Sequence, residues 1–379
     1  MANFEKDFKE CYLQYCDRRQ FLKGAGLIGL SIFLAPALTA CGGGSKQTSP
    51  GPSTGGETGG GQASKKVLKI RHAVSFSKEQ EETTQNLGTW KFKELVEKYS
   101  NGEIIIDVYP SEQLGSQREV AEKVQAGALE ICHISTQNLC QLVPVYNLLD
   151  FPFMFPTREK FAEVMQSDFV KEVVHREVEK KGVKVLWYCP TAFRAFGHNL
   201  NKPVRVPEDI TGIKVRVTGS AVEQEAFRLA GAKPTPVNWS ETYTAMQQKV
   251  VDAVHVGLAP LYNNKIHETF KRVTNLNMML NSELHICNKK WFDSLSAEQK
   301  KVIEKAAEEV GKWIVADQGE KNKKMEDIYR KAGIEIYDLT PEERKVWINK
   351  IGHQLPAWDK MKEQWGKDIY TKLAELASK

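Results

Sequence analysis

The sequence predicts an α/β protein whose folded part consists of two lobes. Early in that part, strand-like and helix-like stretches alternate in units of about thirty residues, which is typical of a parallel sheet covered by helices. A second set of strand-like runs follows at residues 183–188, 213–218 and 250–256. The stretch 296–331 is charged and has helical spacing. A helix of roughly 30 residues spans about 45 Å and can run along both lobes.

Periodicity also places the remaining elements. The helix that follows the first strand carries Leu87, Trp90 and Leu95 toward a core at helical spacing. The first lobe is expected to contain, in chain order, a strand at 67–72, that helix up to Asn101-Gly102, a strand at 104–109, a helix at 116–126 and a strand at 128–135. A helix at about 240–248 precedes the strand at 250–256, and two helices carrying Trp347, Trp358 and Trp365 close the chain.

The chain divides into four expected segments. They are an export signal at 1–40, a lipid anchor and linker at 41–64, a first lobe at 65–191 completed by about 282–322, and a second lobe at 192–281 completed by about 323–379. The linker consists almost wholly of Gly, Ser, Thr, Pro and Gln. Because such a segment has no apolar surface to bury, it is expected to act as a flexible tether.

The N-terminus has the order of an export signal, with a basic region, an apolar core and a small-residue processing site. The apolar core falls short of the roughly 20 residues that a spanning helix needs, so a transmembrane helix is the weaker interpretation. Leu38-Thr39-Ala40-Cys41 resembles a bacterial lipobox, in which the cysteine is acylated, and Arg18-Arg19 resembles a twin-arginine signal although Asp17 replaces the usual Ser or Thr. The alternative is an ordinary signal peptide with an incidental cysteine. Either way the protein is expected outside the cytoplasm, and the lipobox predicts attachment to a membrane through Cys41.

Composition excludes several functions. The formal net charge of +5 is scattered, and no basic stripe is interleaved with aromatic residues, so nucleic-acid binding has no support. The body, from about residue 65 onward, has no Cys-x-x-Cys, His-Glu-x-x-His, Gly-x-Gly-x-x-Gly or Walker motif. We therefore expect no cofactor, no metal ligands and no catalytic residues. Of the four cysteines in the body, Cys132 and Cys140 are close enough in sequence to suggest a disulfide outside the cytoplasm.

One segment of the sequence gives more specific information about function than the composition does. Residues 207–217, PEDITGIKVRV, resemble a "P-x-D-L-K-G-L-K-I-R-V" element of the solute-binding receptors of TRAP (tripartite ATP-independent periplasmic) transporters. The blocks GAKPTP at 231–236 and WSETYTAMQQKVVD at 239–252 resemble the next part of that family, and YPSEQLG at 109–115 and FPFMF at 151–155 also fit. The resemblance covers essentially the whole body in order.

The resemblance implies a fold and a function. The fold would be a periplasmic-binding-protein-like arrangement with a ligand cleft between two lobes and a long C-terminal helix spanning both. The function would be capture of a small organic acid without chemistry, by an arginine that holds its carboxylate and by hinge closure. The implied partners are the integral membrane subunits of a TRAP transporter.

Arg216 is the central candidate. It lies on the opposite parity to Val215 and Val217 in its strand, and a guanidinium can hold a carboxylate through two charge-assisted hydrogen bonds. A buried arginine needs an internal acid or a bound anion. Taken alone, a solvated or internally paired arginine is the more common outcome. The resemblance favours the binding role, because the family's carboxylate-binding arginine falls at this position.

Other candidates follow from resemblance or from position. Arg194 resembles a second arginine that the family places near the carboxylate, and Trp239 takes the place of an aromatic residue that covers the ligand. Each has a plain structural alternative, since Trp239 can be core packing and Tyr243, one helical turn further on, can pack at the hinge or contact a ligand hydroxyl. The ends of the first and third strands bring His72, Ser135 and Asn138 toward the cleft if the topology is as expected.

The sequence departs from the family after Asp252. Many relatives continue with Gly and a Glu-Asn or Trp-Glu pair, whereas this chain reads AVHVGL at 253–258. His255 can hydrogen-bond a ligand hydroxyl or a second carboxylate, or it can be a satisfied buried histidine. The apolar neighbours favour a monocarboxylate with an apolar or aromatic portion over a highly hydroxylated sugar acid.

Two other functions compete with this one. The first is an exported lyase or hydrolase in which His255 acts with Glu241 or Asp252 as an acid-base pair, although no nucleophile or metal set is recognisable. The second is the binding component of an ATP-driven importer, which shares the two-lobed design. The order of motifs through Arg216 argues against it.

Overall fold

The computed structural model describes residues 67–77 and 84–379. The predicted export signal at 1–40 and the linker at 41–64 lie outside the described residues. Within the described ranges, no helix combines the length and the apolar character that crossing a membrane requires.

The first lobe is built on a five-stranded sheet. Its strand order is β2(Ile104–Tyr109), β1(Leu68–Ala73), β3(Ile131–Ser135), β10(Leu280–Asn288) and β4(Val183–Phe193). The three N-terminal strands are parallel, whereas β10 pairs antiparallel with both β3 and β4. The helical segments that accompany this sheet are α2(Thr84–Tyr99), α3(Gln117–Gln125), α4(Thr136–Leu139), η2(Pro144–Asp150), α5(Arg158–Gln166), the π-helix η3(Val170–Val174), α6(His175–Glu179) and α10(Lys289–Asp293).

The second lobe is built on a six-stranded sheet. Its strand order is β11(Glu335–Asp338), β9(Arg272–Asn275), β5(Ala195–His198), β8(Ala253–Val256), β6(Lys214–Val217) and β7(Lys233–Pro236). Its accompanying segments are η4(Pro207–Ile210), α7(Ala221–Leu229), η5(Trp239–Glu241), α8(Thr242–Gln247), α9(Leu258–Asn263) and η6(Ile266–Thr269).

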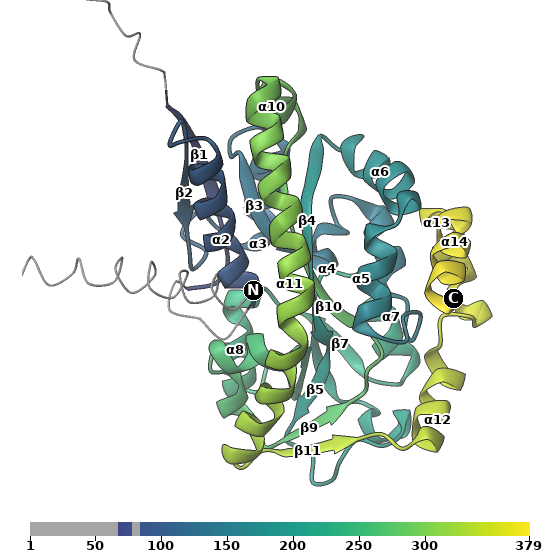
Figure 1. The fold of residues 1–379 in the computed structure, drawn as a ribbon. Coiled ribbons are helices and arrows are strands. Elements are labelled where there is room, and N and C mark those ends of the chain that lie inside the picture. Colours follow the sequence, from purple (N-terminus) through teal and green to yellow (C-terminus); the bar gives the residue numbers. More distant parts are fainter. Residues whose placement is uncertain (1–66, 78–83) are drawn as a thin grey trace, which may run out of the picture. The chain divides into compact units, whose positions relative to one another are not determined.

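Before the C-terminal segments, three connections join the lobes. Strand β4 continues into β5 through the single residue Arg194, and β9 continues into β10 through residues 276–279. The helix α11(Ala297–Lys331) packs on α2 and β4 at one end and on α9 and β11 at the other, as Figure 1 shows. This confirms the prediction of a long helix along both lobes.

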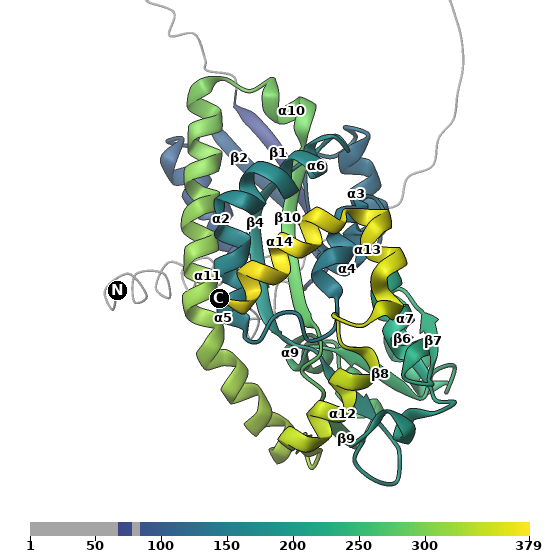
Figure 2. The same cartoon turned by 90° about the vertical axis from the view of Figure 1, so that its right-hand side faces the viewer.

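The C-terminal segments return to both lobes. Helix α12(Pro341–Ile351) contacts α7 and η4, η7(Pro356–Trp358) follows it, α13(Asp359–Trp365) contacts η2, and α14(Lys367–Ser378) contacts α5. Figure 2 shows α14 lying across α5. Three helices and a 3-10 turn therefore close the chain instead of the two helices predicted, because Gly366, at φ 116°, ends one helix before the next begins.

Several boundaries differ from the predictions for local reasons. The helix expected at 116–126 begins after Ser116, which caps it, and ends at Gln125. The third strand begins at Ile131 and not at 128, since Gly127 forms a turn at φ 79°. The strand expected at 183–188 extends to Phe193 because β10 pairs with it along its whole length. The possible Cys132–Cys140 disulfide is absent, and the four described cysteines are free and buried.

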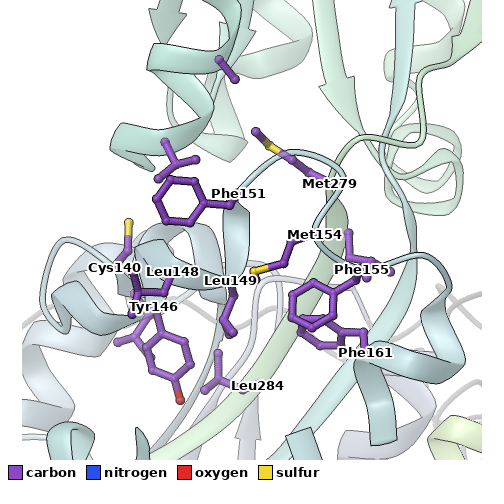
Figure 3. Packing of buried hydrophobic residues seen from close by; sticks show 14 of the residues in the cluster. Cys140, Tyr146, Leu148, Leu149, Phe151, Met154, Phe155, Phe161, Met279 and Leu284 are labelled. Atoms are coloured by element: carbon purple, nitrogen blue, oxygen red, sulfur yellow. The ribbon is translucent and has the colours of Figure 1, made fainter. Parts of the chain in front are cut away.

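The sequence block FPFMF at 151–155 belongs to the largest hydrophobic core. Figure 3 shows Phe151, Met154 and Phe155 packed together with Phe161 and Met279. The same cluster reaches the second lobe through Val215 and Phe227. The core is therefore continuous from one lobe to the other on this side of the molecule.

Candidate functional site

A small cavity lies where the ends of strands from both sheets meet. Its volume is about 30 Å³. Its lining residues are Phe76, Gln117, Ser135, Asn138, Arg194, Arg216, Thr218, Trp239, Val256, Pro260, Asn281 and Glu283. A groove of about 270 Å³ adjoins it and shares Gln117, Asn138, Thr218 and Trp239. Strand ends at such a crossing are where α/β proteins commonly bind small molecules.

Arg216 lies in β6 and is 2% exposed. Its Nε and Nη2 atoms donate to the Val237 carbonyl oxygen at 3.1 and 2.8 Å, and its guanidinium lies 5.7 Å from the centre of the Trp239 ring. Among the described residues no carboxylate forms an ion pair with it. Burial lowers the pKa of Arg216 to about 10, which leaves it charged at neutral pH. The cavity therefore contains a desolvated cation that has no anionic partner.

Arg194 lies at the crossing between β4 and β5 and is equally buried. Its Nη1 donates to Glu223 Oε1 at 2.5 Å and to the His255 carbonyl oxygen at 3.3 Å. Its Nη2 donates to Gln137 Oε1 at 3.0 Å. Unlike Arg216, this arginine has its charge compensated within the protein.

Glu223 is the acid that compensates Arg194. It follows Ser220, whose side chain caps α7, and it is 0% exposed. Its carboxylate accepts from the Thr218 backbone N–H at 2.8 Å and lies 2.8 Å from His255 Nδ1. Burial by itself would raise the pKa of Glu223, but Arg194 and then His255 outweigh it and hold that pKa well below its usual range. The pair fixes Arg194 at the edge of the cavity.

The first lobe contributes a ring of neutral polar groups. Gln117 Oε1 accepts from the Ser135 backbone N–H at 3.0 Å and from Asn138 Nδ2 at 2.9 Å. Asn138 Oδ1 then accepts from the Gly219 backbone N–H of the second lobe at 3.4 Å. These contacts orient Ser135 and Asn138 toward the cavity and join the two lobes across it.

Glu283 is a second buried acid in the lining. It lies in β10 opposite Ser135 of β3 and is 5% exposed. Its Oε2 is 2.7 Å from His133 Nε2, and its Oε1 accepts from Asn281 Nδ2 at 3.3 Å.

The cavity lining contains five of the eight predicted side chains. They are Arg194, Arg216, Trp239, Ser135 and Asn138. His255 lies behind the cavity and holds Glu223, and Tyr243 packs against the hydrophobic cluster around α8. His72 shares the sheet face of His133 and Ser135 but does not line the cavity, since its Nε2 is 2.7 Å from His285 Nδ1 and Phe92 lies nearby.

Glu223, Glu283 and Gln117 of this site were not predicted from the sequence. Glu223 carries one signal, which is its place in the first turn of a helix capped by Ser220, and Glu283 carries another, as the acidic residue of strand 280–288. Gln117 had none, because its role depends on the distance between α3 and α4.

The acid-base pair of the enzyme alternative is not formed. His255 is fully buried and its carboxylate partner is Glu223, whereas Asp252 accepts from the Lys214 backbone N–H and Glu241 lines the adjoining groove. Burial lowers the pKa of His255, although Glu223 opposes this shift. No cluster of three metal-ligating side chains occurs in the part of the chain that the structure describes.

Comparisons with known proteins show a family to which the chain is similar over most of its length. The model of the family "bacterial extracellular solute-binding protein, family 7" matches residues 76–364. The C4-dicarboxylate-binding periplasmic protein DctP of Rhodobacter capsulatus is 30% identical over 304 residues, which cover 80% of this chain and 88% of that protein. The 2,3-diketo-L-gulonate-binding periplasmic protein YiaO of Escherichia coli is 28% identical over 284 residues, which cover 75% of this chain and 85% of that protein.

A solved structure shows the same fold. A TRAP periplasmic solute-binding protein of Shewanella oneidensis with bound succinate has a TM-score of 0.76 and 24% identity, covering 83% of this chain and 100% of that one. This likeness concerns the fold alone, and it confirms the predicted two-lobed α/β architecture.

Proposed function

Because the chain belongs to the bacterial extracellular solute-binding protein family 7, whose members are binding proteins, we propose that it is the extracytoplasmic receptor of a TRAP transporter and that it captures a small organic carboxylate. The ligand would enter between the lobes and place its carboxylate on Arg216. Hinge closure would then remove the ion pair from water and create the surface that the membrane subunits recognise.

The observation that carries this proposal is the unpaired charge of Arg216. A buried guanidinium without an acid is costly, and an incoming carboxylate removes that cost. Val237 O occupies only one direction of the fork, so the guanidinium retains donors for an anion. Trp239 lies beside the guanidinium and supports the role of a cover for the ligand.

We propose that the protein performs no chemistry on its ligand. The relatives are binding proteins, and His255 is fully buried and does not line the cavity. The prediction of a ligand with an apolar portion draws support from Phe76, Val256 and Pro260, which line the cavity. Val254 and Leu258, on which the sequence prediction also rested, are not part of that lining.

Attachment to the membrane through a lipid on Cys41 completes the proposal. A receptor that must return to one transporter benefits from a tether that raises its local concentration. The linker at 42–64 would then let the closed receptor reach the membrane subunits.

The experiment is a thermal-shift screen of the purified full chain against small organic acids. An acid present at about a hundred times its dissociation constant should add roughly 2.7 kcal/mol to the free energy of unfolding. Arg216→Ala should abolish the shift. If Arg216→Ala keeps full affinity, or if the acid is consumed during incubation, the proposed function is wrong.

A further inference from the structure

Glu283 differs from Glu223 because, among the described residues, no lysine or arginine forms an ion pair with it. Within residues 67–77 and 84–379, its titratable neighbour at hydrogen-bonding distance is His133, through Nε2 at 2.7 Å. His133 is 0% exposed, and its Nδ1 has no hydrogen-bond partner among the described residues. The tautomer with the proton on Nε2 fits this geometry, because it donates to Glu283 and leaves no N–H at Nδ1. In that state His133 donates a hydrogen bond to Glu283 but does not neutralise it.

The two arginines of the cavity differ in whether they form an ion pair within the protein. Arg194 forms an ion pair with Glu223, so its charge is neutralised by the protein itself. Among the described residues no acid forms an ion pair with Arg216, although Glu223, which is already paired with Arg194, acts on its charge from further away. The lining therefore presents one uncompensated cation from the second lobe and one uncompensated anion, Glu283, from the first.

A ligand that offsets only Arg216 would leave Glu283 as a buried, unpaired carboxylate and would bring a second negative charge into the same small cavity. Both effects oppose the binding of a simple acid. A ligand with a carboxylate and an ammonium group offsets both sites and creates no new charge. The cavity of about 30 Å³ has room for little more than a water molecule, so most of the ligand would extend into the adjoining groove of about 270 Å³.

We propose, resting on the function proposed above, that Glu283 determines specificity by accepting hydrogen bonds from an ammonium group, and that the ligand is an amino-acid-type carboxylate. Asn281 would position Glu283, since its Nδ2 donates to Glu283 Oε1 and also to Thr191 Oγ1 at 3.1 Å. Ser135, opposite Glu283 in the neighbouring strand, lies at the same end of the cavity.

The test compares ligands that share a carbon skeleton and differ in one substituent. Isothermal titration calorimetry on the full chain would use the sets alanine, lactate and propionate, and aspartate, malate and succinate. We expect the amino member of at least one set to bind at least tenfold more tightly than its hydroxy and unsubstituted partners. A tighter hydroxy or unsubstituted member in both sets would overturn the inference but leave the receptor function standing. Absence of binding by every acid would overturn both.

The variant Glu283→Gln isolates the charge, because glutamine keeps the size of the side chain and can still accept from His133. It should remove the preference for the amino member and leave the affinity for the unsubstituted acid equal or higher. Glu208→Gln, at an exposed position of η4, is the matched control and should preserve the preference. If Glu283→Gln keeps the wild-type preference, Glu283 does not receive the ammonium group. The comparison within the wild-type chain still decides the ligand class if the variant fails to fold.

Discussion

At the scale of single residues, the two arginines of the cavity differ in what they are paired with. Arg194 has Glu223, whereas Arg216 contacts the Val237 carbonyl oxygen and the Trp239 ring and forms no ion pair among the described residues. The difference assigns them different tasks under the proposed function. Arg194 shapes the cavity edge, and Arg216 supplies the charge that the ligand meets.

Arg216→Lys tests the geometry of that charge. Lysine keeps the charge but cannot form two parallel hydrogen bonds with a carboxylate. The loss of one charge-assisted bond costs about 1.5 to 3 kcal/mol, so affinity for the acid found in the screen should fall roughly 10-fold to 100-fold. Calorimetry measures the change, and Arg228→Lys, an exposed arginine of α7 paired with Glu225, should bind as the wild type does. An unaltered affinity in Arg216→Lys would argue against bidentate recognition.

Glu223 makes the stability of the cavity depend on pH. Because its pKa is depressed in the folded protein, its ionised form contributes stability above the unfolded pKa of about 4.3, and this contribution is lost as the pH falls below that value. Breaking its buried pair with Arg194 by Glu223→Gln should cost about 3 to 5 kcal/mol of the free energy of unfolding at pH 7. In urea unfolding at pH 4 and below, the difference in the free energy of unfolding between the wild type and Glu223→Gln should become smaller.

Glu225→Gln, in the same helix but at a more exposed position, is the control for Glu223→Gln. Its effect should stay within about 0.5 kcal/mol at every pH. If the difference in the free energy of unfolding between the wild type and Glu223→Gln stays constant or grows as the pH falls, Glu223 is not ionised in the folded protein as described.

The sequence predicts these residues unequally. The parity of Arg216 in its strand and the family motif indicate its position, and Arg194 follows by resemblance. Glu223 and Glu283 could not be predicted, because their partners lie 29 and 150 residues away in sequence and meet them only once the sheets have formed. His72 lies near the end of its strand as predicted, but its ring is buried against His285 and Phe92 and does not reach the cavity lining.

At the scale of elements, the loop after β6 meets the segment after α4 across the groove. A Cβ atom built on Gly219 would lie 1.6 Å from Gln141 Nε2 and 2.6 Å from its Cδ. Gly219 also donates its backbone N–H to Asn138. The absence of a side chain at this position therefore permits the close approach of the two lobes.

Gly219→Ala should weaken binding by hindering closure, since Gln141 must move before the lobes reach the distance seen here. Because Gln141 is exposed and its terminal amide can rotate aside, the cost should be at most about 1 kcal/mol, so affinity should fall by at most roughly 5-fold. Adding Gln141→Ala to the Gly219→Ala variant should restore most of the lost affinity, because the clash disappears. Calorimetry on the two single variants and the double variant measures the coupling. Strictly additive effects would show that the contact does not limit closure.

Element types were easier to predict than element ends. The helix at 297–331 was evident from its spacing, and the capping box formed by Ser296 and Gln299 fixes its start. The end of β4 was not evident, because its pairing with β10 depends on a strand about ninety residues further along the chain. That extension is what brings Arg194 to the crossing between the lobes.

At the scale of the whole molecule, the proposed receptor needs both an anchor and a closing cleft. The anchor can be tested separately. Cells that express the full chain should incorporate labelled palmitate into it, and Cys41→Ala should abolish the label because the thiol is the site of acylation. Cys140→Ala removes a buried thiol of the body and should leave the label unchanged. Labelling that persists in Cys41→Ala would place the lipid elsewhere.

The central claim is that a ligand carboxylate binds to Arg216 in the closed cavity between the lobes. A crystal structure of the protein with the acid identified in the thermal-shift screen tests it most directly. We predict carboxylate oxygens at about 2.7 to 2.9 Å from the Arg216 guanidinium, beneath Trp239 and within the lining described above. A ligand bound outside this cavity, or one inside it that leaves Arg216 bonded to Val237 alone, would contradict the claim.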